Sequence, residues 1–326
     1  MRASGDHREE DIIIPVMGET KAGKSTLINR FLREAVEKET EGEMPVNAGL
    51  KSCTKKVVPA IILKTPDEAL NDALRGRRLV FVDTPGFNDA GPDMSDRKVL
   101  NLVSDWLAAS YREKTIVGGV IYLHDITQEG WTRSSQTNLD LFFKLCGEEA
   151  MTQVSIVATK WDKISTRLDE GTERLKELKN DYWKHMIQQD ASVCILQPDV
   201  SPDQRAASEG SIPPWGIIHR LVSSMDGRSV VLQIQTEIVK LEKELGETEA
   251  GKELRRKLEE LLADAKKTRR ELKIQPSNPM DLSESQRKIE AIREDLVQLV
   301  PSTRKAFLRW VRGKWQSGKA AVGFKG

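Results

Sequence analysis

The chain has 326 residues, of which 31% are charged and 38% are hydrophobic, and its net charge is +1. This length allows one large domain with an appendage or two domains, and the near-neutral charge gives no overall attraction to nucleic acid. The three cysteines (Cys53, Cys146 and Cys194) lie far apart without paired spacing, which argues against a disulfide framework or a zinc site and favours a reducing compartment.

The beginning of the chain, residues 1–10, is charged and lacks an apolar core. We therefore expect a disordered N-terminus and no signal peptide. No apolar run approaches the roughly 18 residues that a membrane-spanning helix needs. These features predict an intracellular, cytoplasmic protein that at most attaches to the surface of a membrane.

Short apolar runs alternate with amphipathic runs between residues 11 and 226. We expect strands at 12–17, 57–63, 79–82, 119–123, 154–158 and 193–196, and helices at 25–36, 96–113, 135–145, 166–189 and 214–225. This alternation predicts an α/β domain of three layers, in which a mostly parallel sheet is covered by helices on both faces.

A phosphate-binding motif follows the first expected strand. The segment from Gly18 to Ser25 fits G-x-x-x-x-G-K-[ST] and leads into an expected helix, which makes a chance match in a glycine turn remote. Backbone N–H groups at a helix N-terminus attract phosphate, Lys24 would contact the β- and γ-phosphates, and Ser25 would ligate Mg²⁺. The predicted nucleotide-binding residues of this motif are Gly18, Glu19, Thr20, Lys21, Ala22, Gly23, Lys24, Ser25 and Thr26.

A second motif, Asp83-Thr84-Pro85-Gly86, follows the expected strand 79–82. Its residues are also typical of a plain turn at the end of a strand. The position of the motif after the phosphate motif favours instead a Mg²⁺-associated carboxylate at Asp83. The N–H of Gly86 would contact the γ-phosphate, and residues 87–95 would form a switch segment. Thr54 is predicted to complete the Mg²⁺ shell with Ser25 and Asp83, and Ser52 is the alternative.

A third motif, Thr159-Lys160-Trp161-Asp162, fits [NT]-K-x-D after a buried strand. Asp162 can accept hydrogen bonds from both N1–H and N2–H of guanine, a pairing that adenine cannot match, and the stem of Lys160 would lie along the base. A charged loop is the alternative interpretation. Residues 197–213 must cover the other face of the base, although no single residue among them is assigned.

The order of these motifs resembles the translation-factor-related GTPases. Within that class the chain is similar to the septin-like branch, which includes immunity-associated GTPases and chloroplast-import receptor GTPases, and most of all to fungal G-domain proteins of this kind. The resemblance covers about residues 11–225 and is carried by residues 16–20, 52–54, 83–87, 121–124 and 144–147. It implies GTP or GDP and Mg²⁺ as cofactors and a homodimer across the nucleotide face, often at membranes.

Two residues depart from the pattern of that family. Lys21 stands where glycine is usual, and it is either a built-in cation that reaches the phosphates or a solvated side chain at the rim. Phe87 stands where a glutamine often orients the attacking water. We therefore expect slow, Mg²⁺-dependent GTP hydrolysis that dimerisation activates, with Lys24, Thr54 and Gly86 in catalytic contact. A GTP-bound scaffold without turnover is the alternative, and an ATPase is a third option. His124 is a weak candidate for the residue that orients the attacking water in place of glutamine.

The composition and the hydrophobic pattern of the sequence change after residue 226. Residues 227–300 are dense in Glu, Lys and Leu, and the apolar spacing breaks between Leu245 and Leu254, where Gly246 and Gly251 lie. This pattern predicts a broken coiled coil, with two short helical pieces within 230–273, arranged as a hairpin, and another helix at 283–300. Such a segment could bind a helical partner.

The tail, residues 301–326, is basic and aromatic. No acidic residue follows Asp295, and seven Lys and Arg residues lie in the last 23 positions, so the tail carries +7 and the rest of the chain −6. Phe307, Val311 and Trp315 recur at a helical spacing among the basic residues. Docking on the nucleotide-binding domain, contact with an anionic membrane surface and nucleic-acid binding are the three alternatives, in that order of preference.

Overall fold

The computed structural model describes residues 11–46, 54–87, 94–164, 166–199, 211–225, 230–274 and 279–301. The chain divides into two compact units, Met1–Gln235 and Thr236–Gly326, and the predicted domain limit at 226 lies inside the first of them. The predicted disordered N-terminus, Ser52, Cys53, residues 275–278 and the basic tail from 302 onward lie outside the described residues.

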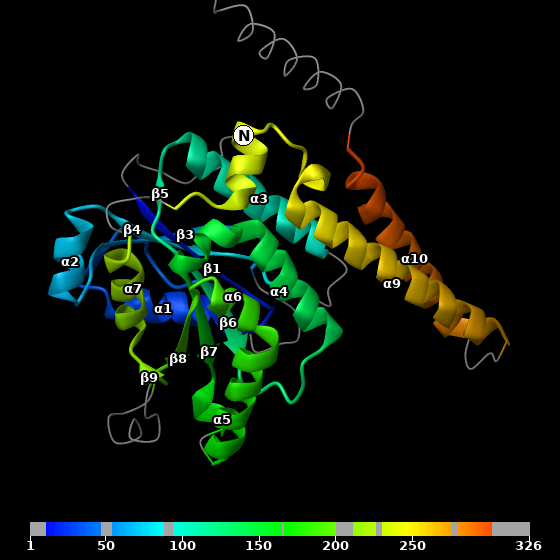
Figure 1. Ribbon diagram of the computed structural model, residues 1–326, viewed down its shortest axis with the longest axis horizontal. Helices are drawn as coiled ribbons and strands as arrows, with labels where there is room; N and C mark the ends of the chain where they lie inside the picture. The colour runs from blue at the N-terminus through cyan, green and yellow to red at the C-terminus, as the bar shows by residue number, and fades with distance from the viewer. Residues whose placement is uncertain are drawn as a thin grey trace, which may run out of the picture. The chain divides into compact units, whose positions relative to one another are not determined.

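The first unit contains a twisted sheet (Figure 1). Its described strands are β1 (Ile12–Gly18), β2 (Glu37–Lys38), β3 (Val58–Lys64), β4 (Leu79–Asp83), β5 (Ile116–Val117), β6 (Val120–Asp125), β7 (Val154–Thr159), β8 (Ser192–Leu196) and β9 (Ser211–Ile212). They lie in the order β2-β3-β4-β1-β6-β7-β8-β9, with β5 also paired to β1. The pairs β2–β3 and β3–β4 are antiparallel and the other described strand pairs are parallel, as the mostly parallel prediction requires.

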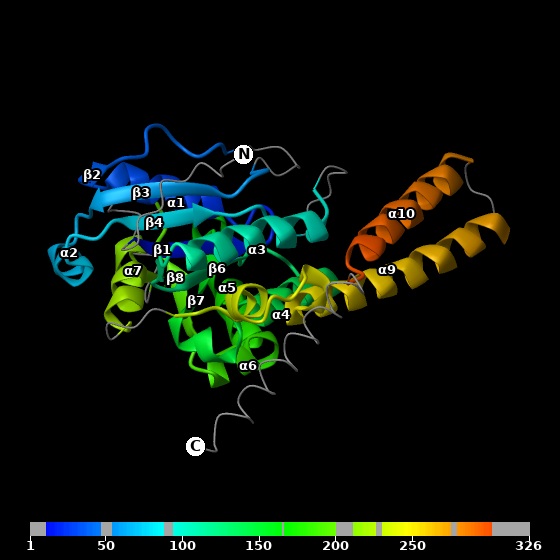
Figure 2. The same cartoon turned by 90° about the horizontal axis from the view of Figure 1, so that it is seen from above.

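Helices cover both faces of this sheet, so the predicted three-layer α/β architecture is confirmed (Figure 2). Alternate residues of β1 (Ile12, Ile14 and Val16) share one buried cluster with side chains of α1 (Lys24–Glu34), α2 (Glu68–Leu74) and α7 (Pro214–Ser223). In that cluster the ring of Phe31 stacks on Phe81 at 4.1 Å between centroids.

The opposite face carries α3 (Asp96–Arg112) and α4 (Arg133–Cys146). Tyr122 of β6 packs there against Phe142 of α4, with 4.6 Å between ring centroids. The short helix α8 (Gln233–Gln235) closes this layer, because the side-chain amide of Gln235 donates to the carbonyl of Leu107 in α3 at 3.0 Å.

The helix predicted at 166–189 is broken into three pieces. They are α5 (Leu168–Glu177), the π-helix η3 (Leu178–Tyr182) and α6 (Lys184–Gln188). The break falls just before the fully buried Trp183, whose ring lies 5.4 Å from that of His124 in β6, and π-helical turns are often found at functional sites. Four short elements (α2, β2, β5 and β9) were not predicted, since two- and seven-residue segments carry little periodic signal.

The second unit is helical, as predicted, but its hairpin is formed by other segments. A π-helical turn, η5 (Thr236–Lys240), and the 3₁₀ turn η6 (Leu245–Glu247) precede α9 (Glu249–Ile274), which packs along α10 (Pro279–Gln298). The predicted break is present, because η5 ends at Lys240 and α9 begins at Glu249. The predicted hairpin within 230–273 is wrong, because α9 is one long helix and α10 is its partner. In the described part of the chain, no helix is both long and apolar enough to cross a membrane.

The glycines of the predicted break mark close contacts of the backbone in this second unit. A Cβ atom on Gly251 would lie 1.8 Å from the carbonyl oxygen of Leu245, and one on Gly246 would lie 1.8 Å from that of Leu299. Cβ atoms do not approach backbone that closely, so both positions require glycine. The capping box of Glu244 and Glu247 then forms the turn η6 just before α9.

Candidate functional site

The predicted site residues meet at one edge of the sheet. Strands β1, β4, β6 and β7 run parallel to one another and end at Gly18, Asp83, Asp125 and Thr159. In open α/β sheets ligands bind at the carboxyl ends of the parallel strands. The three sequence motifs therefore converge on the edge where this architecture places a ligand.

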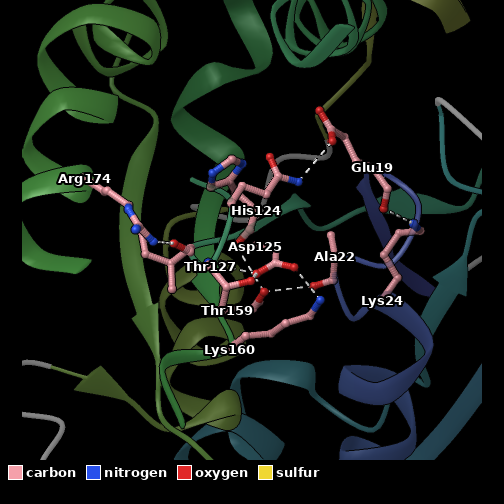
Figure 3. Close-up of polar contacts among 11 residues, drawn as sticks. Glu19, Ala22, Lys24, His124, Asp125, Thr127, Thr159, Lys160 and Arg174 are labelled. Carbon is pink, nitrogen blue, oxygen red and sulfur yellow. Dashed lines mark hydrogen bonds and ion pairs between the residues drawn. The ribbon is translucent and has the colours of Figure 1, made fainter. Parts of the chain in front are cut away.

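The phosphate motif forms a curved loop between β1 and α1. Gly23 and Lys21 adopt left-handed conformations, with φ of 98° and 70°, and α1 begins at Lys24. The buried ammonium of Lys24 turns back into the loop, where its Nζ donates to the carbonyls of Gly18 at 3.1 Å and Glu19 at 2.8 Å (Figure 3). The loop thus holds one buried cation at its centre, while the side chain of Lys21 is exposed.

Ser25, Thr54 and Asp83 come together beside this loop, although they are far apart in the sequence. Oδ2 of Asp83 accepts hydrogen bonds from the hydroxyls of Ser25 at 2.8 Å and Thr54 at 3.1 Å. The two hydroxyl oxygens are 3.3 Å apart. Three side chains with oxygen atoms of the kind that ligate Mg²⁺ therefore lie within hydrogen-bond distance of one another.

The carboxylate of Asp83 is 1% exposed, and its other oxygen, Oδ1, has no hydrogen-bond partner among the described residues. Burial raises the pKa of Asp83, and the hydrogen bond from Ser25, the charge of Lys24 and the hydrogen bond from Thr54 offset only part of that effect. A buried acceptor without a partner costs free energy, and a bound cation would supply one.

The second motif lies directly against the phosphate loop. The carbonyl of Phe87 accepts a hydrogen bond from the N–H of Thr20 at 3.1 Å, and a Cβ atom on Gly86 would lie 2.5 Å from the same nitrogen. Gly86 therefore has to be glycine for this approach. The ring of Phe87 is 3% exposed, so the position after Gly86 presents no polar side chain. Residues 88–93 of the predicted switch lie outside the described part of the chain.

The base-reading motif is attached to the phosphate loop by a hydrogen bond. The hydroxyl of Thr159 lies 2.9 Å from the carbonyl of Ala22 and 3.1 Å from that of His124, and it donates to this pair of oxygens. Lys160 follows in a left-handed conformation with φ of 63°, and Asp162 exposes its side chain to solvent. The hydroxyl of Thr159 thus contacts backbone, whereas the side chain of Asp162 is open to a ligand.

Asp125, at the end of β6, was not predicted from the sequence. Its carboxylate forms an ion pair with the ammonium of Lys160, and its Oδ1 accepts from the N–H and the hydroxyl of Thr127 at 3.0 and 2.6 Å (Figure 3). The only signal for it in the sequence is an acidic residue at the end of the expected strand 119–123. That this strand lies beside the one leading to Thr159 is seen only in the structure.

His124 lies in an aromatic cluster. Its ring is 5% exposed and lies 5.6 Å from Trp131 and 5.4 Å from Trp183 between centroids, while Trp131 stacks on Tyr182. Burial lowers the pKa of His124 to about 4, against the opposing charges of Glu19 and Asp125. The ring is therefore neutral at physiological pH and packed between aromatic rings.

Residues 13–160, which contain the first two motifs and the first two residues of the third, match the model of the family described as 50S ribosome-binding GTPase. This segment has the fold of a P-loop GTPase domain. The match ends at Lys160, within the base-reading motif, and leaves the rest of the chain unassigned. A comparison with characterised protein sequences finds no significant match.

The solved structures that are similar to this chain have low sequence identity to it. Toc33 from Arabidopsis thaliana in complex with GDP and Mg²⁺ is 13% identical over 69% of this chain and 88% of that one, with a TM-score of 0.42. Era in complex with MgGDPNP and a segment of 16S ribosomal RNA is 20% identical over 58% of this chain and 51% of that one, with a TM-score of 0.37. The elongation factor SelB from Methanococcus maripaludis is 12% identical over 70% and 36% of the two chains, with a TM-score of 0.35.

Proposed function

We propose that the GTPase domain is a guanine-nucleotide switch that binds GTP and GDP with Mg²⁺ and hydrolyses GTP slowly. The observation that carries this proposal is the convergence of Ser25, Thr54 and Asp83 beside a phosphate loop with Lys24 at its centre. Nucleotide content of the purified protein is the first test. Co-purified or readily bound GDP supports the proposal, and a preparation that binds neither GDP nor GTP at any Mg²⁺ concentration contradicts it.

The residues present fit a magnesium–nucleotide complex. Mg²⁺ prefers oxygen ligands, and the unpartnered Oδ1 of Asp83 is a buried acceptor that a cation would satisfy. The proposed Mg²⁺-binding residues are Ser25, Thr54 and Asp83, and a bound Mg²⁺ would neutralise charge on the phosphates. Lys24 and the backbone of residues 18–26 would hold the phosphates, with the N–H of Gly86 on the γ-phosphate.

Base recognition is assigned to Lys160 and Asp162, with Thr159 attaching the motif to the phosphate loop. The carboxylate of Asp162 accepts two hydrogen bonds from guanine, whereas an amide accepts one and donates one. Asp162→Asn should therefore weaken GDP and favour xanthosine diphosphate, whose second carbonyl accepts from the amide. Unchanged affinity of the variant for GDP, with no gain for the xanthine nucleotide, would contradict this assignment.

Hydrolysis is expected to be slow because Phe87 offers no hydrogen bond to water. The side chain of Lys21 is exposed on the phosphate loop. We propose that its ammonium is a built-in cation that reaches the phosphates of the bound nucleotide. Lys21→Ala should lower the single-turnover rate of GTP hydrolysis while GDP affinity changes little, and Lys21→Arg should retain most of the rate. A rate unchanged in Lys21→Ala would identify Lys21 as a solvated residue at the rim.

Dimerisation across the nucleotide face is the proposed route to activation. The resemblance to the septin-like branch and the absence of a polar side chain at Phe87 support this step. Single-turnover hydrolysis measured against protein concentration tests it, because activation by a second copy makes the rate rise with concentration. A rate independent of concentration, with the protein monomeric throughout, would contradict it.

The second candidate is a GTP-bound scaffold without turnover, which the buried ring of Phe87 favours. In that case assembly would use the helices of residues 230–300, and no phosphate would be released at any concentration.

We further propose that the basic tail, which lies outside the described residues, makes peripheral contact with membranes in the cytoplasm. Co-sedimentation with anionic but not neutral vesicles would support this contact, and loss of the tail should abolish it.

A further inference from the structure

The loop that follows β6 has contacts with both the phosphate loop and the base motif. The side-chain amide of Gln128 donates to the carboxylate of Glu19 at 3.3 Å, and the N–H of Ile126 donates to the carbonyl of Thr159 at 3.2 Å. Between these contacts lies the ion pair of Asp125 and Lys160. Figure 3 shows the side chains of Asp125 and Lys160 directed toward one another from the ends of neighbouring strands.

Both oxygens of the Asp125 carboxylate are in use, and its side chain is 13% exposed. Oδ1 accepts the two hydrogen bonds of Thr127, and Oδ2 faces the ammonium of Lys160, whose side chain is 22% exposed. Burial by itself would raise the pKa of Asp125, but the hydrogen bonds and charge of Lys160 and the contacts of Thr127 hold that pKa below its usual value. The carboxylate is therefore ionised at neutral pH and the ion pair persists.

The backbone of Lys160 is fixed as well. Its left-handed conformation follows Thr159, whose carbonyl and hydroxyl are both hydrogen-bonded. A lysine has a flexible four-carbon stem with a large rotamer entropy. With its first atoms fixed by the backbone and its ammonium fixed by Asp125, the stem between them has few remaining conformations.

We propose that Asp125 is a positioning residue for guanine recognition, which holds the stem of Lys160 ready to lie along the base. This inference rests on the proposed function, because Lys160 is assigned to the base there. Asp125 touches no nucleotide atom in this role and acts through Lys160. Ordering a side chain before the ligand arrives lowers the entropy cost of binding, so the ion pair should increase affinity for every nucleotide that carries the base.

The test compares Asp125→Asn, Lys160→Met and the double variant of the full-length protein by GDP titration. Asp125→Asn should weaken GDP about tenfold, which corresponds to about 1.4 kcal/mol and lies in the range for contacting residues. In the Lys160→Met background the same change should have little further effect. Additive losses in the double variant would overturn the inference, because they would show that Asp125 acts independently of Lys160.

A ligand without a base separates positioning from a general structural role. Inorganic tripolyphosphate should compete with equal strength for the wild type and for Asp125→Asn, since it does not use Lys160 stacking. Equal weakening of tripolyphosphate and GDP would overturn the inference in favour of a damaged phosphate loop. Asp190→Asn, at an exposed left-handed position, is the matched control and should bind GDP as the wild type does.

Two further outcomes are distinguishable. If the wild type binds no guanine nucleotide, the proposed function fails, whereas wild-type binding with additive variants overturns this inference alone. If Asp125→Asn does not fold, Thr127→Val takes its place, because it removes one hydrogen bond to Asp125 and leaves the charge. Thr127→Val should weaken GDP about threefold, and an undiminished effect in the Lys160→Met background would overturn the inference.

Discussion

Asp83 combines two properties that a single side chain rarely has without a ligand. It is almost fully buried, and one of its carboxylate oxygens has no hydrogen-bond partner among the described residues. Its raised pKa shows that burial outweighs the nearby hydroxyls and Lys24. A divalent cation would reverse this balance, since it stabilises the ionised form, and the site is therefore expected to be coupled to Mg²⁺.

Replacing Asp83 by Asn should separate the two roles of the carboxylate. The variant loses a charge that the cation needs, so GTP affinity in the presence of Mg²⁺ should fall by about 10- to 100-fold. Affinity in EDTA should change much less. Titrations of labelled GTP with and without Mg²⁺ measure both values, with Asp72→Asn on the exposed surface of α2 as the control. An equal loss under both conditions would exclude a metal-linked role.

His124 makes folding stability dependent on pH. Its pKa is lowered to about 4 in the folded chain, chiefly by burial, from about 6.5 in an unfolded chain. Between these values the unfolded state binds the extra proton, so stability is full above pH 6.5 and is lost as pH falls toward 4. The free energy of unfolding should drop by about 2 kcal/mol between pH 7 and pH 5 from this residue.

Urea unfolding of the nucleotide-free protein at pH 7, 6 and 5 measures this dependence. His124→Phe keeps an aromatic ring between the tryptophans and cannot bind a proton, so its unfolding free energy should vary less with pH. A wild type and variant with the same pH dependence would show that other groups dominate.

At the scale of elements, the second unit depends on two glycines. Gly251 lies in the first turn of the 26-residue helix α9, where alanine normally stabilises by about 1 kcal/mol. Here a methyl group would meet the carbonyl oxygen of Leu245 at 1.8 Å. Gly251→Ala should therefore destabilise the helical unit, by about 1–3 kcal/mol as overpacking does, and far-UV circular dichroism during urea unfolding would measure it.

Gly130 provides the comparison for that substitution. A Cβ atom there meets nothing within 4 Å, so Gly130→Ala should be neutral or slightly stabilising. If both variants are equally stable, the close approach of Gly251 to Leu245 does not constrain the fold.

The sequence was sufficient for the long strands and for the three motifs, because each has a local pattern. Contacts that depend on the order of the strands in the sheet could not be predicted from the sequence. Asp125 and Lys160 are 35 positions apart, and they meet because β6 and β7 are neighbours that end in register, with Asp125 opposite Thr159. The π-helical turn before Trp183 and the pairing of α9 with α10 depend likewise on tertiary packing, which outweighs local periodicity.

For the molecule as a whole, the sheet edge links ligand binding to stability. Strands β1, β4, β6 and β7 all contribute to the candidate site, so a nucleotide bound there favours the state in which they are paired. A ligand at 100 times its Kd adds about 2.7 kcal/mol to the free energy of unfolding. GDP with Mg²⁺ should therefore raise the Tm seen by scanning calorimetry, and ADP at the same concentration should not. An identical shift with both nucleotides would contradict guanine selectivity.

The stack of Trp131 on Tyr182 has a spectroscopic consequence. The two rings are 4.4 Å apart, and Trp131 also faces the buried ring of His124. Trp131 belongs to the loop that reaches Glu19 through Gln128, so its indole emission should respond to movement of that loop against η3. The chain thus carries an intrinsic fluorophore in a loop that contacts its own phosphate loop, and Trp131→Phe identifies which part of the emission comes from it.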